Sequence, residues 1–124
     1  MAKIPEFLLR SLYVKGSLRH LEQETGFAFD LKNELGAARI VGVEPLLLDR
    51  KPIPLARSYF LRDDDKASFT TVSQENSVLM RKGEVVTVRV TEERLGPGRH
   101  TLGIHVIVKD LGALRFTVSD SVHA

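Results

Sequence analysis

The chain has 124 residues, of which 18 are Lys or Arg and 16 are Asp or Glu, and it contains neither Cys nor Trp. A formal net charge of +2 is too small for the basic face of a nucleic-acid binder, and the lack of Cys excludes thiolate nucleophiles, redox pairs and Cys-ligated zinc. No apolar run approaches the roughly 20 residues of a membrane helix, and the N-terminus has no secretory signal. We therefore expect a soluble, cytoplasmic protein with one domain over residues 1–124.

The first predicted elements are short. Residues 1–10 are expected to form an N-terminal arm or a short helical turn, because the helical pattern there is too short to be stable alone. Leu12, Val14 and Leu18 predict a first strand, and the polar residues 22–26 predict the connection to the next one.

Residues 27–32 show a clear two-residue period, which places alternate side chains on opposite faces of a strand. Phe27, Phe29 and Leu31 alternate with Ala28, Asp30 and Lys32. This pattern predicts a strand with one buried face.

Two further strands are predicted at about 38–48 and 52–61. Pro45, Pro52 and Pro54 cannot donate to a β-ladder, so these strands are expected at a sheet edge or interrupted by a bulge. Leu48 to Pro52 predicts a tight turn between them, although no Gly marks a position of positive φ.

The polar residues 62–77 are expected to form a long loop that crosses between sheets, with room for an irregular strand at 69–72; a functional loop is the alternative. This stretch includes the adjacent carboxylates of Asp63, Asp64 and Asp65. An EF-hand instead spaces its ligands at alternate positions and ends with a Glu, so no specific metal is predicted here.

Three more alternating segments follow, and the apolar residues of each segment share one face. These residues are Val86, Val88 and Val90, then Leu102, Ile104, Val106 and Val108, and finally Leu114, Phe116 and Val118. A turn at residues 110–112 predicts that the last two segments form a hairpin. Pro97 and Gly98 predict a corner that carries the chain from one sheet to the other, with Leu95 and Leu102 in the core.

Together these elements predict an all-β fold, an antiparallel two-sheet sandwich with an immunoglobulin-like Greek key and about seven strands. The physical reason is that one face of each antiparallel sheet must be buried against a partner. The Pro-Gly corner resembles those before a late strand of immunoglobulin-like sandwiches, although barrels and jelly rolls also use it.

The four His residues lack the spacing of a local metal site. They are His20, His100, His105 and His123. We expect His105 to face outward, His100 to make a hydrogen bond at the corner, and His123 to lie in a frayed tail.

No nucleophile elbow, P-loop or dinucleotide-binding turn is present in the sequence. Residues 96–98 precede a predicted strand rather than a helix, so they do not form a phosphate cradle. The missing βαβ units argue against a self-contained NAD-dependent reductase. No catalytic, cofactor-binding or metal-binding residue is therefore predicted, and no cofactor is expected on this chain.

Some apolar residues fall on predicted outward faces. Val85 and Ile107 are two of them. Tyr13, Tyr59 and Phe60 add aromatic side chains, and one small core need not bury all of them, so we expect aromatic surface. Ordinary surface apolarity explains them as well as a buried protein–protein face does.

Four segments, Leu12–Leu18, Gly26–Asn33, Leu48–Pro52 and Leu95–His100, together resemble the small β subunit of C-glycoside deglycosidases. The resemblance covers most of the chain in length and strand order. It implies a sandwich that assembles with a larger TIM-barrel α subunit, which carries the divalent metal and the catalytic His and cleaves oxidised C-glycosides by elimination. No catalytic residue of that family maps onto this chain, and Asp63–Asp65 match none of its motifs.

Three functional hypotheses follow. The first is a non-catalytic accessory subunit of a carbon–carbon lyase acting on C-glycosides, with the larger catalytic subunit as its protein partner. The second is an independent, homo-oligomeric β-sandwich binding module. The third, a stand-alone hydrolase or isomerase, would need activity that depends on His100 or His105. Nucleic acid and membrane are not expected as partners.

Overall fold

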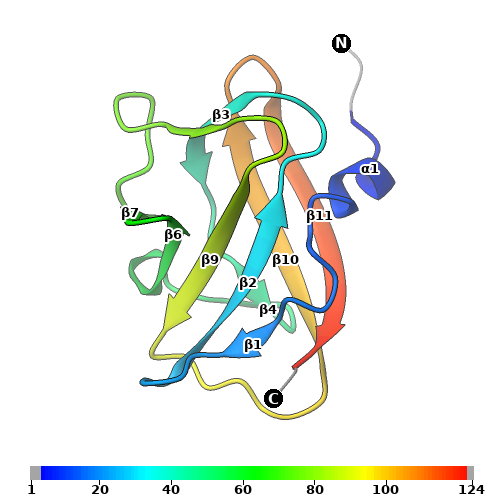
Figure 1. The fold of residues 1–124 in the computed structure, drawn as a ribbon, viewed down its shortest axis with the longest axis vertical. Coiled ribbons are helices and arrows are strands. Elements are labelled where there is room, and N and C mark those ends of the chain that lie inside the picture. Colours follow the sequence, from blue (N-terminus) through cyan, green and yellow to red (C-terminus); the bar gives the residue numbers. More distant parts are fainter. Residues whose placement is uncertain (1–3, 123–124) are drawn as a thin grey trace.

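The computed structural model describes residues 4–122 and shows two antiparallel β-sheets packed face to face (Figure 1). The five-stranded sheet contains, in spatial order, β1 (Arg19–His20), β2 (Gly26–Lys32), β9 (Val85–Thr91), β6 (Ser58–Arg62) and β7 (Asp65–Ser68). The six-stranded sheet contains β5 (Lys51–Pro52), β4 (Leu47–Leu48), β10 (Arg99–Val108), β3 (Ala38–Val43) and β8 (Val78–Met80), and β11 (Gly112–Ser121) pairs with β10. The predicted two-sheet sandwich is confirmed, with eleven strands among the described residues where about seven were expected.

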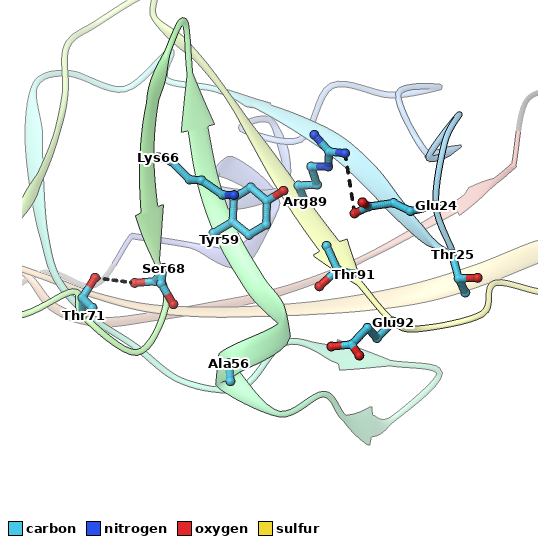
Figure 2. A pocket seen from close by; sticks show the side chains of 10 residues that line it. All are labelled: Glu24, Thr25, Ala56, Tyr59, Lys66, Ser68, Thr71, Arg89, Thr91 and Glu92. Atoms are coloured by element: carbon cyan, nitrogen blue, oxygen red, sulfur yellow. Dashed lines mark hydrogen bonds and ion pairs between the residues drawn. The ribbon is translucent and has the colours of Figure 1, made fainter.

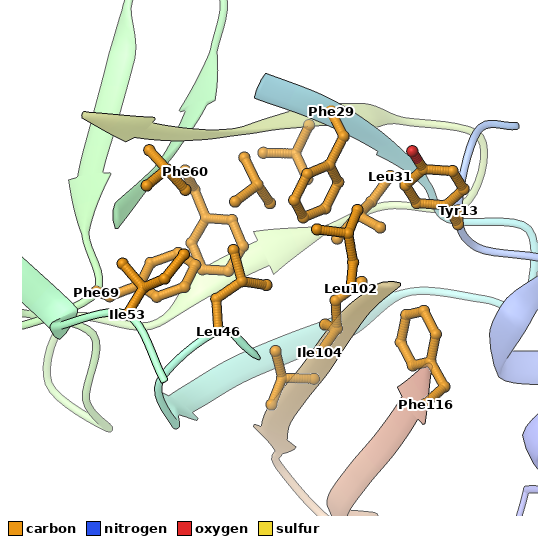
Figure 3. Close-up of a cluster of buried hydrophobic side chains, with 14 of the residues drawn as sticks. Tyr13, Phe29, Leu31, Leu46, Ile53, Phe60, Phe69, Leu102, Ile104 and Phe116 are labelled. Atoms are coloured by element: carbon orange, nitrogen blue, oxygen red, sulfur yellow. The ribbon is translucent and has the colours of Figure 1, made fainter. Parts of the chain in front are cut away.

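The apolar core lies between the two sheets (Figure 3). The alternating residues of β9 and β10 point into it as predicted, and Val88 and Leu102 are at most 2% exposed. Tyr13 packs on Phe29 with ring centroids 5.6 Å apart. The expectation of aromatic surface was wrong for Tyr13 and Phe60, because both side chains are buried in this core.

The Pro-Gly corner behaves as predicted. It leads from β9 in one sheet to β10 in the other, and Leu95 and Leu102 are both buried. Gly98 has a φ of +94°, a conformation that L-residues rarely adopt. The predicted hairpin of β10 and β11 also forms, in register from Arg99–Ser121 to Val108–Gly112.

The N-terminal turn forms a short helix, α1 (Glu6–Arg10), beside β11 (Figure 1). Glu6 Oε2 accepts the Thr117 backbone N–H at 3.2 Å, while Arg10 Nε donates to the Thr117 carbonyl at 3.0 Å. The Arg10–Glu6 ion pair, 2.9 Å long, joins the two contacts. These side chains take the place of a neighbouring strand and cover part of the β11 edge, which would otherwise offer unpaired backbone groups.

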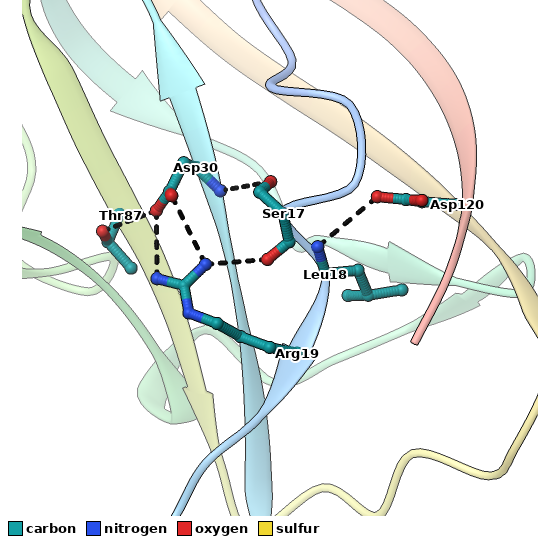
Figure 4. Close-up of polar contacts among 6 residues, drawn as sticks. All are labelled: Ser17, Leu18, Arg19, Asp30, Thr87 and Asp120. Carbon is teal, nitrogen blue, oxygen red and sulfur yellow. Dashed lines mark hydrogen bonds and ion pairs between the residues drawn. The ribbon is translucent and has the colours of Figure 1, made fainter. Parts of the chain in front are cut away.

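The strand predicted at Leu12 to Leu18 was wrong. The segment makes only an isolated bridge, between Tyr13 and Leu31, before the chain turns at Gly16 with φ +82°. Asp120 on β11 holds this segment, because its Oδ2 accepts the Tyr13 hydroxyl at 2.6 Å and the backbone N–H of Gly16 at 3.0 Å. The same oxygen accepts the backbone N–H of Leu18 at 3.4 Å (Figure 4). Burial alone would raise the pKa of Asp120, but these hydrogen bonds outweigh it and lower that pKa.

The strands predicted at 38–48 and 52–61 each break into two parts. Pro45 separates β3 from β4, and a 3₁₀ turn, η1 (Leu55–Arg57), follows Pro54 and precedes β6. Only β5, which contains Pro52, lies at a sheet edge as expected, whereas β3 and β6 have neighbours on both sides. The expected bulge is found in the ladder between β3 and β10, where Ile107 faces Gly42 but Val108 faces Ile40, so the register shifts by one residue. Pro45 and Pro54 lie outside β3 and β6.

The turn after Leu48 forms, with positive φ at Asp49 and Arg50 rather than at a Gly.

The polar residues 62–77 are not one loop. Asp63 and Asp64 make a tight turn, and β7 pairs back onto β6 from Asp65 to Ser68. The irregular strand expected at 69–72 is wrong, because β7 ends at Ser68 and Phe69 turns into the core.

Candidate functional site

A broad groove lies on the outer face of the five-stranded sheet (Figure 2). It is open to solvent and has a volume of about 970 Å³. Its lining residues come from β6, β7, β9 and the connections beside them: Glu24, Thr25, Ala56, Tyr59, Lys66, Ser68, Thr71, Arg89, Thr91 and Glu92. We call this surface the polar groove.

Strand alternation places the groove residues on the outer face. In β9, Val88 and Val90 point into the core, so Arg89 and Thr91 point outward. The register pairs Tyr59 of β6 with Arg89 on one side and with Ser68 of β7 on the other. Three neighbouring strands therefore bring an aromatic ring, a guanidinium and a hydroxyl into one row.

Tyr59 is the centre of this row. The Lys66 Nζ atom lies 4.3 Å from the centroid of its ring, and the Arg89 Cζ atom lies 6.0 Å from it. Each such cation–π contact contributes about 0.5–1 kcal/mol at an exposed site. The ring and the two cations are therefore held together before any partner arrives.

Acidic residues balance the two cations. Arg89 Nη2 lies 3.6 Å from Glu24 Oε1, whereas its Nε is buried without a hydrogen-bond partner among residues 4–122. Glu92 adopts a left-handed backbone with φ +58°, and its N–H donates to the Thr25 carbonyl at 2.9 Å. A non-glycine residue in this conformation costs about 1 kcal/mol or more, so the fold holds Glu92 at the end of β9 against a local preference.

A second polar network lies on the same outer face, on β1, β2 and β9 (Figure 4). Arg19 Nη2 and Asp30 Oδ1 are 3.1 Å apart, and the Thr87 hydroxyl donates to the same oxygen at 2.7 Å. The Ser17 hydroxyl accepts the Asp30 N–H at 2.9 Å. Polar side chains thus cross-link this face from β1 to β7, which reduces the entropy that binding would cost.

The groove offers hydroxyls and charges of both signs. Among its described lining residues, no hydroxyl is hydrogen-bonded to a His or carboxylate side chain that could act as a general base. Across residues 4–122, no three His, Asp or Glu side chains come together in a way that could hold a metal ion.

The His residues singled out in the sequence lie apart from the groove. His100 makes the predicted corner hydrogen bond, from Nε2 to the Gly96 carbonyl at 2.6 Å, and its Nδ1 is 2.7 Å from Asp49 Oδ2. Burial lowers the pKa of His100, but the bonds to Asp49 and Gly96 outweigh it, so that pKa is raised.

His105 lies on the outer face of the six-stranded sheet as expected, where Arg115 Nε donates to its Nε2 at 3.3 Å. Burial and the charge of Arg115 lower the pKa of His105. His20 is exposed on β1, and His123 lies outside the described residues. The carboxylates of Asp63 and Asp64 are exposed at the turn before β7.

Sequence reasoning missed Lys66 and Arg89 as functional candidates. Tyr59 was noted as a surface aromatic residue, but its neighbours depend on the pairing of β6 with β7 and β9. Because the first of these pairings lies in the stretch expected to be a loop, Lys66 had no predicted place on a sheet. The alternating pattern of β9, which places Arg89 on the outer face, was the one feature of the sequence that could have pointed to the groove.

The fold and the groove define an all-β sandwich domain with an ordered polar groove on the outer face of one sheet. A family model described as Hydroxymethylglutaryl-CoA reductase, N-terminal domain, matches residues 8–123. The chain belongs to this family. No curated protein matches the chain.

The family match corrects the resemblance drawn from the sequence. The chain is not a C-glycoside deglycosidase β subunit, and the accessory role in C-glycoside cleavage is wrong with it. The segments that suggested it are core and turn positions, such as Gly26–Asn33 and Leu95–His100, which many sandwiches share. The family match lends no specific support to an independent homo-oligomeric module either. None of the described helices has the length and apolar character to cross a membrane.

Proposed function

We propose that this chain is a non-catalytic binding domain of a hydroxymethylglutaryl-CoA reductase, and that its polar groove contacts the catalytic part of that enzyme. The family match over residues 8–123 supports the link to the reductase. A domain described as N-terminal is one part of a larger enzyme, so a protein contact is the first role to expect for it.

The observation that carries this proposal is the ordered row of Tyr59, Lys66 and Arg89. Tyr and Arg are the residue types that most often dominate binding energy at protein interfaces. The Tyr59 ring centroid lies 4.3 Å from Lys66 Nζ and 6.0 Å from Arg89 Cζ, and these contacts order the three side chains on the sheet. Less side-chain entropy is therefore lost on association. The flanking carboxylates of Glu24 and Glu92 favour a partner surface that carries both charges.

The first test measures binding between the purified chain and the catalytic region of the reductase by isothermal titration calorimetry. Tyr59→Ala is expected to weaken binding by roughly thirtyfold, the effect of losing about 2 kcal/mol at an interface centre. Tyr59→Phe keeps the ring and should retain most of the affinity. Arg89→Ala should weaken binding, whereas the matched control Arg115→Ala, on the outer face of the other sheet, should not.

The second test follows the consumption of hydroxymethylglutaryl-CoA with a nicotinamide reductant present. The purified chain alone is expected to consume none. Measurable reduction by the chain alone would contradict a non-catalytic role. Equal loss of binding in Arg115→Ala and Arg89→Ala, or no binding at micromolar concentrations, would contradict the assignment of the groove as the contact surface.

A further inference from the structure

An apolar cavity lies between the two sheets, beneath the turn that joins β10 and β11. Its volume is about 190 Å³, and it reaches the surface at one end of the sandwich. Its walls are apolar side chains from both sheets, including Ile40, Val86, Val106, Val108, Leu114 and Phe116. It is separate from the polar groove and shares no lining residue with it.

Small residues line one wall of the cavity. Ala37, Ala38 and Gly36 form its wall at the start of β3. A Cβ built on Gly36 would meet nothing within 4 Å, so the turn before β3 stands away from the core.

Asn33 keeps this turn from collapsing into the space. Its Nδ2 donates to the Gly36 carbonyl at 2.6 Å and to the Met80 carbonyl at 2.9 Å. Its Oδ1 accepts the N–H of Leu35 at 3.2 Å and of Gly36 at 3.3 Å. The turn is thereby tied to β8, and the cavity wall is held open by a buried polar side chain whose hydrogen bonds are satisfied.

The entrance combines apolar rim residues with one cation. Leu35 and Leu111, which line the cavity, are 42% and 48% exposed, so two large apolar side chains stand partly in water beside one opening. Neighbouring exposed apolar side chains often mark a binding site. Lys32 also lines the opening, and its Nζ lies 3.2 Å from Glu34 Oε1 on the surface. An exposed ion pair of this kind contributes little to stability, so little free energy is lost when a ligand carboxylate replaces Glu34 as the partner of Lys32.

We propose that this cavity binds a straight, saturated acyl chain of about six to eight carbons, with its anionic end at Lys32; a dry cavity of about 150 Å³ already accepts a benzene ring. The apolar lining selects the chain, and the single cation at the rim selects the charged end. This binding does not depend on the proposed contact with a reductase, since the two surfaces are separate.

The test uses methyl-labelled protein and nuclear magnetic resonance, with octanoate as the probe. Methyl signals of Ile40, Val86 and Val108 should shift and saturate, while those of Ile53 and Val90, which do not line the cavity, should stay in place. Affinity should rise roughly fourfold with each methylene from butanoate to octanoate. It should then level off at decanoate, because the cavity is full.

Ala38→Leu adds three carbons inside the cavity and should weaken octanoate binding by roughly fiftyfold, since three methylenes of the probe lose their place. Ala113→Leu adds the same three carbons to an exposed position of β11 and is the matched control. Ala37→Phe, in the exposed turn at the entrance, blocks access without touching the core and serves if Ala38→Leu fails to fold.

Lys32→Gln tests the anionic end. It should weaken octanoate but leave the neutral octan-1-ol unchanged. The proposal is overturned if octanoate causes no saturable shift at millimolar concentration, if remote methyls shift equally, or if Ala113→Leu weakens binding as much as Ala38→Leu does.

Discussion

Strand β9 serves two surfaces with opposite chemistry. Val86 lines the apolar cavity between the sheets, while Arg89 and Thr91, an odd number of residues further on, line the polar groove. The groove is a set of polar side chains fixed by contacts with each other, and the cavity is a space that small residues leave open. Alternation alone assigns each residue to its side, but the neighbouring strands decide what that side can bind.

The largest difference between the two faces should appear on β2. Phe29 is fully buried between the sheets, whereas the next residue, Asp30, is on the outer face. Phe29→Ala should lower the free energy of unfolding by about 3–5 kcal/mol, through lost burial and the cavity it leaves. Asp30→Ala should cost about 1 kcal/mol, because its ion pair with Arg19 is partly exposed. Urea denaturation measures both, and equal costs would contradict the assignment of the faces.

Asp120 shows what a buried polar cluster contributes when it is structural. Asp120→Ala leaves the Tyr13 hydroxyl and the Gly16 and Leu18 N–H groups without their acceptor. We expect a loss of about 2–3 kcal/mol in unfolding free energy. Tyr13→Phe removes only one of these bonds and should cost about 1 kcal/mol. Thermal unfolding of both variants checks the order, and a larger effect of Tyr13→Phe would be inconsistent with Asp120 as the anchor.

Filling the cavity should stabilise the fold. Ala38→Leu would bury three more carbons against Ile40 and Met80 and raise the unfolding free energy by about 1–2 kcal/mol. Ala113→Leu, exposed on β11, should change it by less than about 0.5 kcal/mol. Urea denaturation measures the difference. A loss of stability in Ala38→Leu would mean that the space beside residue 38 does not accept a larger side chain.

The smallest expected effect is the pH dependence of the corner at His100. The pKa of His100 is raised, so its contribution is complete below about pH 6.5 and disappears as the pH rises through the raised pKa. The pKa of Asp49 is lowered by the Thr101 N–H and by His100, so the contribution of this carboxylate holds above its ordinary value of 3.8 and is lost in more acidic solution.

The pair therefore adds most to the unfolding free energy between these two pH limits. Its contribution is less than about 1 kcal/mol, because the Asp49 side chain is half exposed. Unfolding measured from pH 5 to 9 should show a decline that His100→Gln removes. A decline of the same size in His100→Gln would assign the pH dependence to other groups.

Predictions from local patterns succeeded where one strand decided the outcome. The inward residues of β9 and β10, the β10–β11 hairpin and the corner at Pro97–Gly98 all follow from alternation and turn residues close in sequence. They failed where distant contacts decided. The polar composition of Asp65–Ser68 does not indicate a strand, and β7 forms because β6 offers it an open edge.

The sequence by itself determined the class of fold, because a two-residue period forces each strand to bury one face and expose the other. Tertiary structure alone decided the pairing of Tyr59 with Arg89 and the space beside Ala38. Strand pairing and packing volume depend on residues that are far apart in the chain, so no short segment of sequence specifies them.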